Sequence, residues 1–137
     1  MGLPKICLLL GIAVYAASFF LPAVRAGGES MQGYFCAWIT LTAITSIREL
    51  DRVTDFLAIP IGWINPLAVA YLGLRAADKR IRIGVAMVAL ALIPVTWVYL
   101  AAEGIGVLIG HVLWVVGLFM MMAPEVIRAV RRRIAGK

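Results

Sequence analysis

Apolar residues along this chain are gathered into long, almost uncharged stretches that short polar connectors separate. An α-helix needs about 20 mainly apolar residues to cross the hydrocarbon core of a bilayer. Four stretches reach or approach that length: residues 6–24, 56–74, 83–102 and 107–127. A fifth, residues 34–47, is shorter and carries several hydroxyl groups, so we expect a helix lying at the membrane interface. The pattern predicts an all-α integral membrane protein, a bundle of four transmembrane helices plus a short interfacial helix on the outer side.

The composition indicates the same environment. Hydrophobic residues make up 64% of the 137 residues and charged residues only 15%, whereas a soluble domain is roughly half apolar and about a quarter charged. A single domain of this length keeps much of its surface exposed and cannot bury so much apolar area inside itself. We therefore expect one membrane domain over residues 1–137, with the lipid bilayer as its solvent.

Lysine and arginine are unevenly distributed between the two sides of the predicted bundle. With an inner N-terminus and four spans, the inner side holds ten basic and two acidic residues, and the outer side three basic and five acidic ones. In membrane proteins the short cytoplasmic connectors carry the excess of Lys and Arg. We expect both termini in the cytoplasm, and we interpret the first stretch as an uncleaved helix rather than a signal peptide.

A basic run continues the last predicted helix towards the C-terminus: Arg128, Arg131, Arg132 and Arg133. Each basic residue near a membrane surface gains about 1 kcal/mol from anionic lipid headgroups, and the same run would suit an acidic cytoplasmic partner. Because the run borders an apolar stretch, the net charge of +6 indicates membrane contact and no nucleic-acid partner. Glu125 lies three residues before Arg128 and is expected to pair weakly with it.

Glycines at the start of the last predicted helix are spaced for close packing. Gly106 and Gly110 form a GxxxG pattern, and Gly117 follows one heptad later. Small residues at this spacing allow two helix backbones to approach closely in a membrane. They would serve packing inside the bundle or, alternatively, contact with another membrane subunit or a second copy of the chain.

A polar residue and a proline are neighbours inside the second predicted span, at Asn65 and Pro66. Pro66 has no N–H, so it removes the helical hydrogen bond to the carbonyl of Gly62 and bends the helix. Lipid cannot form hydrogen bonds with a polar group inside the membrane, so other groups of the protein must do so. We expect the Asn65 amide to reach a carbonyl one turn earlier or to cross to a neighbouring helix.

Aromatic residues concentrate in the predicted outer half of the bundle. The tryptophans among them are Trp38, Trp63, Trp97 and Trp114. Tryptophan favours the membrane interface because its ring is apolar while its N–H still meets water or headgroups. The four residues predict an outer aromatic belt or, alternatively, an aromatic surface for a hydrophobic ligand or a partner helix.

His111 is the only histidine and lies about one turn inside the predicted outer surface. Ionisable residues within a membrane are functional candidates. As a cofactor-binding residue, His111 would ligate a haem iron or a pigment magnesium, or hydrogen-bond a quinone carbonyl. The plainer alternative is a histidine satisfied by water, by Glu103 or by a backbone carbonyl. The sequence itself requires no cofactor.

The chain lacks the residue patterns on which most chemistry depends. No serine or threonine stands at helical spacing from a histidine or lysine, and no phosphate loop or metal-site motif is present. No acidic residue lies deep inside a predicted span, which argues against an ion-coupled transporter. We predict a non-enzymatic accessory or structural subunit of a larger membrane complex, or a self-associating protein. The alternatives are a small oligomeric transporter or channel, and a pigment, haem or quinone binder using His111.

Three motifs, "ASFFLPAV", "GWINPL" and "GHVLWVVGLFMMM", lie at the end of the first predicted span, in the second and in the fourth. Together they resemble a group of small, uncharacterised bacterial membrane proteins with four transmembrane helices. In that pattern His111 stands where a tyrosine is expected. The resemblance implies a multi-pass protein of the bacterial inner (cytoplasmic) membrane, and it implies no activity.

Overall fold

The computed structural model describes residues 3–43, 55–74 and 79–135. Within them the chain forms six helices and three short strands. The helices are α1 (Leu3–Ser18), α2 (Gly33–Ala43), α3 (Asp55–Gly62), α4 (Ile64–Gly73), α5 (Lys79–Ala102) and α6 (Ile109–Ala135). The strands are β1 (Pro22–Ala26), β2 (Glu29–Gln32) and β3 (Gly106–Val107).

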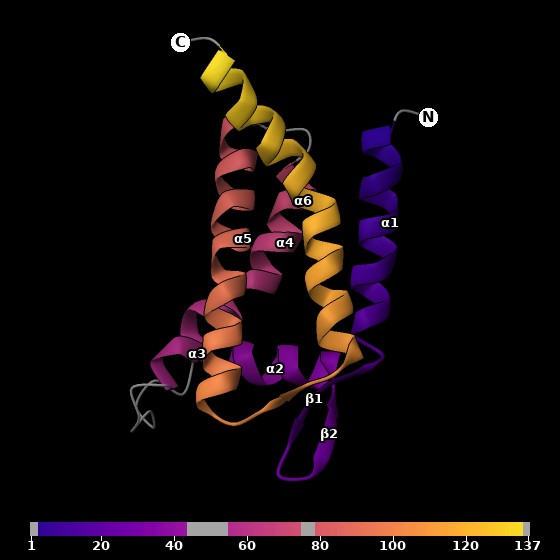
Figure 1. Ribbon diagram of the computed structural model, residues 1–137, viewed down its shortest axis with the longest axis vertical. Coiled ribbons are helices and arrows are strands. Elements are labelled where there is room, and N and C mark those ends of the chain that lie inside the picture. Colours follow the sequence, from indigo (N-terminus) through magenta and orange to yellow (C-terminus); the bar gives the residue numbers. More distant parts are fainter. Residues whose placement is uncertain (1–2, 44–54, 75–78, 136–137) are drawn as a thin grey trace.

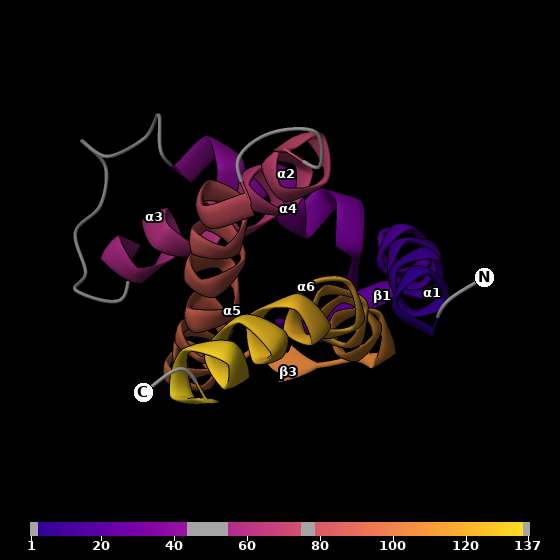
Figure 2. The ribbon, with the colours of Figure 1, turned by 90° about the horizontal axis from the view of Figure 1, so that it is seen from above.

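Four of the helices, α1, α4, α5 and α6, run along the long axis of the molecule (Figure 1). Helix α2 lies across one end of them, beside the strands. We call this the sheet end, and we call the end where α1 begins and α6 finishes the tail end. Figure 2 shows α1 at one margin of the bundle, with α6 between it and α5. Helix α2 covers part of the predicted interfacial helix, whose residues 44–47 lie outside the described residues, and its position at a membrane interface stays a prediction.

The described residues include three apolar helical stretches that are long enough to cross a membrane, Phe56–Gly73, Lys79–Ala102 and Ile109–Ala135. By their length and composition they indicate a membrane protein. They correspond to three of the four predicted spans. The first predicted span is shorter, because only Lys5–Ser18 forms an apolar helix there. The predicted bundle of four transmembrane helices is therefore not confirmed.

Helix α1 ends at Ser18, and the prediction of a helix up to residue 24 is wrong at this end. The amides of Phe19, Phe20 and Leu21 each bond to the carbonyl three residues earlier, which is the hydrogen-bond pattern of a 3₁₀ turn at a helix end. Pro22 follows, and the residue before a proline is disfavoured in the helical region. The Ser18 hydroxyl donates to the Tyr15 carbonyl at 2.6 Å, and the chain then enters β1.

The strands form an antiparallel sheet in the order β2-β1-β3 at the sheet end, which the all-α prediction missed. Gly27 and Gly28 connect β1 to β2 with positive φ angles of 59° and 89°, a conformation that glycine adopts without steric cost. In the second pairing, Arg25 of β1 faces Gly106 of β3. The fourth predicted span is wrong at its start for this reason, because residues 106 and 107 pair with β1 and the helix begins at Ile109.

The second predicted span is divided at Trp63, between α3 and α4. Pro66 cannot donate to the carbonyl of Gly62, and its ring presses on the same turn. The chain continues through hydrogen bonds from the Trp63 amide to the Pro60 carbonyl and from the Leu67 amide to the Trp63 carbonyl. Figure 1 shows α3 turned away from the axis of α4. The predicted bend is therefore present, as a break in the helix.

The apolar core joins α4, α5 and α6, and α1 packs mainly on α6. Ile64, Leu118 and Met122 are among the side chains with the least exposure. A Cβ on Gly117 would lie 2.7 Å from the backbone nitrogen of Tyr15, and a Cβ on Gly11 would lie 2.8 Å from the backbone nitrogen of Met121. The backbones of α1 and α6 thus meet directly, with no space for a side chain between them.

We expect Gly117→Ala to lower the thermal unfolding temperature of the detergent-solubilised protein. The added methyl group forces the backbones of α1 and α6 apart, and overpacking of this kind costs about 1–3 kcal/mol. Gly84→Ala is the matched control, because a Cβ there meets nothing within 4 Å and alanine favours helix by about 0.5–1 kcal/mol over glycine. Equal unfolding temperatures for Gly117→Ala and the original protein would contradict the close contact.

Candidate functional site

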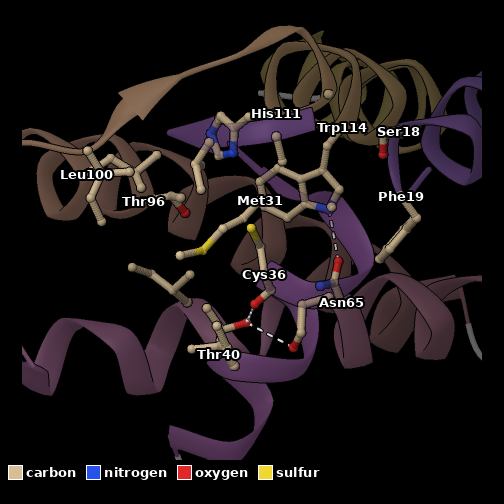
Figure 3. Close-up of a pocket in the computed structure, with 18 of the residues that line it drawn as sticks. Ser18, Phe19, Met31, Cys36, Thr40, Asn65, Thr96, Leu100, His111 and Trp114 are labelled. Carbon is tan, nitrogen blue, oxygen red and sulfur yellow. Dashed lines mark hydrogen bonds between the residues drawn. The ribbon is translucent and has the colours of Figure 1, made fainter. Parts of the chain in front are cut away.

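A cavity of about 150 Å³ lies at the sheet end, between the end of α1, strand β1 and helices α2, α4, α5 and α6. Most of the side chains that line it are apolar or aromatic. Figure 3 shows polar side chains from different segments converging on it. Those that carry nitrogen, oxygen or sulfur at the walls include Ser18, Cys36, Thr40, Asn65, Thr96, His111 and Trp114.

His111 lies in the first turn of α6 and is only 7% exposed. Its ring contacts Trp97, at a centroid distance of 5.6 Å, and Trp114, at 5.3 Å. The Nε2 atom is buried and has no hydrogen-bond partner among the described residues. Within that part of the chain, neither Glu103 nor a backbone carbonyl bonds to this atom. A buried polar atom without a partner costs about 1–3 kcal/mol, so this one requires an explanation.

Asn65 connects α4 to two other helices. Its Oδ1 accepts a hydrogen bond from the Tyr15 hydroxyl of α1 at 2.8 Å and from Nε1 of Trp114 of α6 at 2.9 Å. An indole N–H only donates, so the amide atom facing Trp114 is the oxygen. This orientation leaves the NH₂ group of Asn65, which lines the cavity, with no acceptor among the described residues. Of the two expected roles, the amide takes the one that crosses to neighbouring helices.

Three hydroxyl groups around the cavity donate to nearby backbone carbonyls. Ser18 donates to Tyr15, Thr40 to Cys36 and Ala37, and Thr96 to Leu92. Local bonds of this kind satisfy a hydroxyl proton without any ligand. His111 and Asn65 therefore remain as the two wall residues with uncommitted nitrogen atoms in the described part of the cavity.

Cys36 supplies a thiol to the cavity wall from α2. Burial raises the pKa of this thiol above its usual range, because desolvation disfavours the thiolate. Alkylation requires the thiolate, so Cys36 reacts faster as the pH is raised. Cys7 is also a free thiol but lies outside the cavity, in α1, and offers an internal reference for labelling.

The predicted aromatic belt divides into two groups. Trp38, Trp63 and Trp97 are 64%, 50% and 44% exposed, as an interfacial belt requires. Trp114 differs, because its indole N–H is bonded to Asn65 inside the protein and its ring forms part of the cavity wall. The belt interpretation therefore does not apply to Trp114.

The predicted GxxxG pattern does not form a helical surface, because Gly106 belongs to β3. Gly110 packs against the chain that leaves α1, where an added Cβ would lie 2.7 Å from the carbonyl oxygen of Pro22. Gly117, further along α6, packs against Tyr15 of α1. These contacts hold the start of α6, and with it His111, against the cavity.

The tail end carries a second polar cluster, and its pairing differs from the prediction. Glu125 forms an ion pair with Arg82 of α5 and accepts a hydrogen bond from the Tyr71 hydroxyl at 2.9 Å. Arg128, the expected partner of Glu125, donates from Nε to the Pro124 carbonyl at 2.9 Å. Spacing along one helix could not predict a partner on another helix. The remaining basic residues of the run, Arg131, Arg132 and Arg133, are exposed.

Sequence reasoning missed most of the cavity wall. Tyr15, which does not line the cavity but bonds to the wall residue Asn65, gave the one usable indication, since a phenol inside an apolar stretch needs a hydrogen-bond partner when buried. Cys36, Thr40 and Thr96 carried no such indication, because the cavity brings together segments that are distant in the sequence. In the described residues, no group of three or more His, Cys, Asp or Glu side chains is placed to hold a metal ion.

The chain matches no protein-family model, no curated protein and no solved structure. The function therefore has to be inferred from the geometry of the cavity and from the residues around it.

We expect Asn65→Leu to destabilise the protein by about 2 kcal/mol, because it leaves the Tyr15 hydroxyl and the Trp114 N–H buried without an acceptor. Tyr15→Phe removes one donor and leaves the other bond intact, so its cost should stay below about 1 kcal/mol, the usual size of one interhelical hydrogen bond in a membrane. Thermal unfolding in detergent measures both variants. If Tyr15→Phe cost as much as Asn65→Leu, the shared acceptor would not be the contact that matters.

Proposed function

We propose that this is a non-enzymatic membrane protein that binds a small ring-shaped ligand in the cavity at its sheet end, with His111 as the polar anchor. The observation that carries the proposal is His111, which lines a largely apolar cavity and whose buried Nε2 atom has no hydrogen-bond partner among the described residues. Ligand sites in proteins are mostly apolar, with a few placed polar groups that orient the ligand.

The cavity volume supports a ligand with a single ring. An engineered apolar cavity of about 150 Å³ binds benzene, and drug-sized ligands occupy about 300–1,000 Å³. The volume here, about 150 Å³, is thus too small to enclose a haem or a chlorophyll-type pigment. Among the ligands considered for His111, a quinone-type ring fits best. The rings of Phe19 and Trp114, which line the cavity, provide aromatic faces for it.

The polar atoms of the cavity favour a ligand with two acceptors. A neutral imidazole with its proton on Nε2 donates one hydrogen bond, and the NH₂ group of Asn65 donates another. Figure 3 shows His111 and Asn65 on either side of the Trp114 ring. A para-quinone carries two carbonyl oxygens on opposite sides of one ring and therefore offers one acceptor to each donor.

We expect duroquinone, whose four methyl groups prevent it from alkylating cysteines, to bind at least tenfold more tightly than durene, which has the same ring and no carbonyls. His111→Leu should weaken duroquinone binding about tenfold, since one hydrogen bond contributes about 0.5–1.5 kcal/mol, and leave durene binding unchanged. Titration calorimetry in detergent measures both ligands. Thr96→Val is the matched control and should leave both affinities unchanged, because the Thr96 hydroxyl is bonded to the Leu92 carbonyl.

Thiol labelling gives an independent readout of the same ligand. Bound duroquinone should slow the alkylation of Cys36, which lines the cavity, and leave that of Cys7 unchanged. Equal affinities for duroquinone and durene, with no protection of Cys36, would rule out the proposed function.

We also propose that the protein lies in the bacterial inner membrane with both termini cytoplasmic. Three observations support this location and this orientation. Arg80 and Arg82 at the start of α5 and Arg131, Arg132 and Arg133 near the end of α6 lie at the tail end, where α1 begins, and cytoplasmic sides carry such an excess. The exposed tryptophans belong to segments nearer the sheet end. The motif resemblance is to bacterial proteins. In this orientation the cavity opens in the outer half of the bilayer.

A second candidate function is that of an accessory subunit, and the length of α1 favours it. Its 16 residues span about 24 Å at about 1.5 Å per residue, less than the roughly 30 Å of hydrocarbon in a bilayer. A helix that is too short can be accommodated by association with other membrane chains. Leu9 and Leu10 of α1 are about half exposed, so the outward side of this helix is open to such a contact.

We expect native mass spectrometry from mild detergent to show a complex, either with another membrane protein or between copies of the chain. Leu10→Trp should reduce the fraction in the complex, because it enlarges a side chain on the contacting helix. Val88→Trp on α5 is the control, since Val88 is similarly exposed. A monomer with no co-purifying partner would exclude the subunit function and leave ligand binding untouched.

A further inference from the structure

A second hollow lies next to the cavity, between α2 and the junction of α3 with α4. Its volume is about 270 Å³, and Tyr34, Trp38 and Leu41 of α2 line one side of it. Gly62 and Pro66 line the other side. We call this hollow the α2 groove. The three α2 side chains are 55%, 64% and 44% exposed, so the groove opens to the surroundings of the protein.

The α2 groove and the cavity share part of their lining. Phe19, Ala37 and Asn65 line both hollows, so the two hollows adjoin at these residues. The helix break at Trp63 contributes to the opening, because Gly62 has no side chain and Pro66 bends the chain away. A ligand that reached from the cavity into the groove would pass the side chains that both hollows share.

The lining of the α2 groove is largely apolar and suits a hydrocarbon chain. Its polar groups are those of Tyr34, Trp38 and Asn65, and the Asn65 oxygen is already occupied by two donors. Phe19, Leu41 and Pro66 supply carbon surface. In a membrane protein, lipid is what meets such a surface, so a ligand that arrives through the groove arrives from the bilayer.

We propose that the α2 groove holds the hydrocarbon tail of the ligand whose ring occupies the cavity. The ligand is then a lipid-soluble para-quinone with one long tail, taken up sideways from the bilayer. This inference rests on the proposed function, and it adds the class of the ligand and its route. Transfer of a tail from lipid to an apolar groove gains little free energy, so the location of the tail, rather than a gain in affinity, is the measurable consequence.

Cysteine protection locates the tail directly. In a background of Cys7→Ser and Cys36→Ala, Leu41→Cys places one thiol in the α2 groove, and Val69→Cys places one on α4, where Val69 is 66% exposed and lines neither hollow. The probes are duroquinone and a trimethyl-para-benzoquinone with a decyl tail. At about ten times its Kd, the tailed quinone should slow maleimide labelling of Leu41→Cys about tenfold. Duroquinone should not slow it, and neither ligand should protect Val69→Cys.

The outcomes separate this inference from the proposed function. Protection of Leu41→Cys by neither ligand, with duroquinone still bound, overturns the tail site and leaves the ring site intact. Protection by both ligands also overturns it, because the ring itself would then lie in the groove. Absence of duroquinone binding removes the proposed function.

Discussion

The side-chain oxygen of Asn65 accepts hydrogen bonds from Tyr15 of α1 and Trp114 of α6, and so joins three helices at one point. In lipid, apolar side chains gain little by exchanging one apolar neighbour for another, so packing and shared hydrogen bonds decide how helices associate. The two bonds also orient the groups around the cavity. They turn the Trp114 ring into its wall and leave the Asn65 NH₂ group as a donor, so one contact sets both the bundle and the site.

The cavity exists because the chain at the sheet end is not helical. After α1 the backbone passes so close to the start of α2 that a Cβ on Gly33 would lie 2.5 Å from the Ser18 carbonyl oxygen. The β1–β3 pairing satisfies part of this backbone, and Ser18, Phe19 and Ala23 of this segment line the cavity together with residues of the helices. The cavity is thus a consequence of how α1 ends.

Local rules predicted the parts of the fold that depend on one segment. The length of the apolar runs identified α5 and α6, and the missing N–H of Pro66 identified the break before α4. The end of α1 and the sheet were missed, because the pairing of Arg25 with Gly106 joins segments that no local pattern connects. Glu125 shows the same limit, since helical spacing favoured Arg128 while the ion pair is with Arg82. Of the site, His111 and Asn65 were recognisable as polar groups in apolar surroundings, whereas their neighbours were not.

The energetics of His111 indicate that its polar atom contributes little to folding. Its ring contacts with Trp97 and Trp114 contribute about 0.5–1.5 kcal/mol each beyond burial. The buried Nε2 without a partner among the described residues costs about 1–3 kcal/mol, so the two effects nearly cancel. A leucine, of similar volume, would forgo both and leave the stability of the empty protein almost unchanged. The property that only the histidine supplies at this position is a hydrogen-bonding nitrogen in largely apolar surroundings, which is the reason for proposing His111 as the anchor of a ligand acceptor.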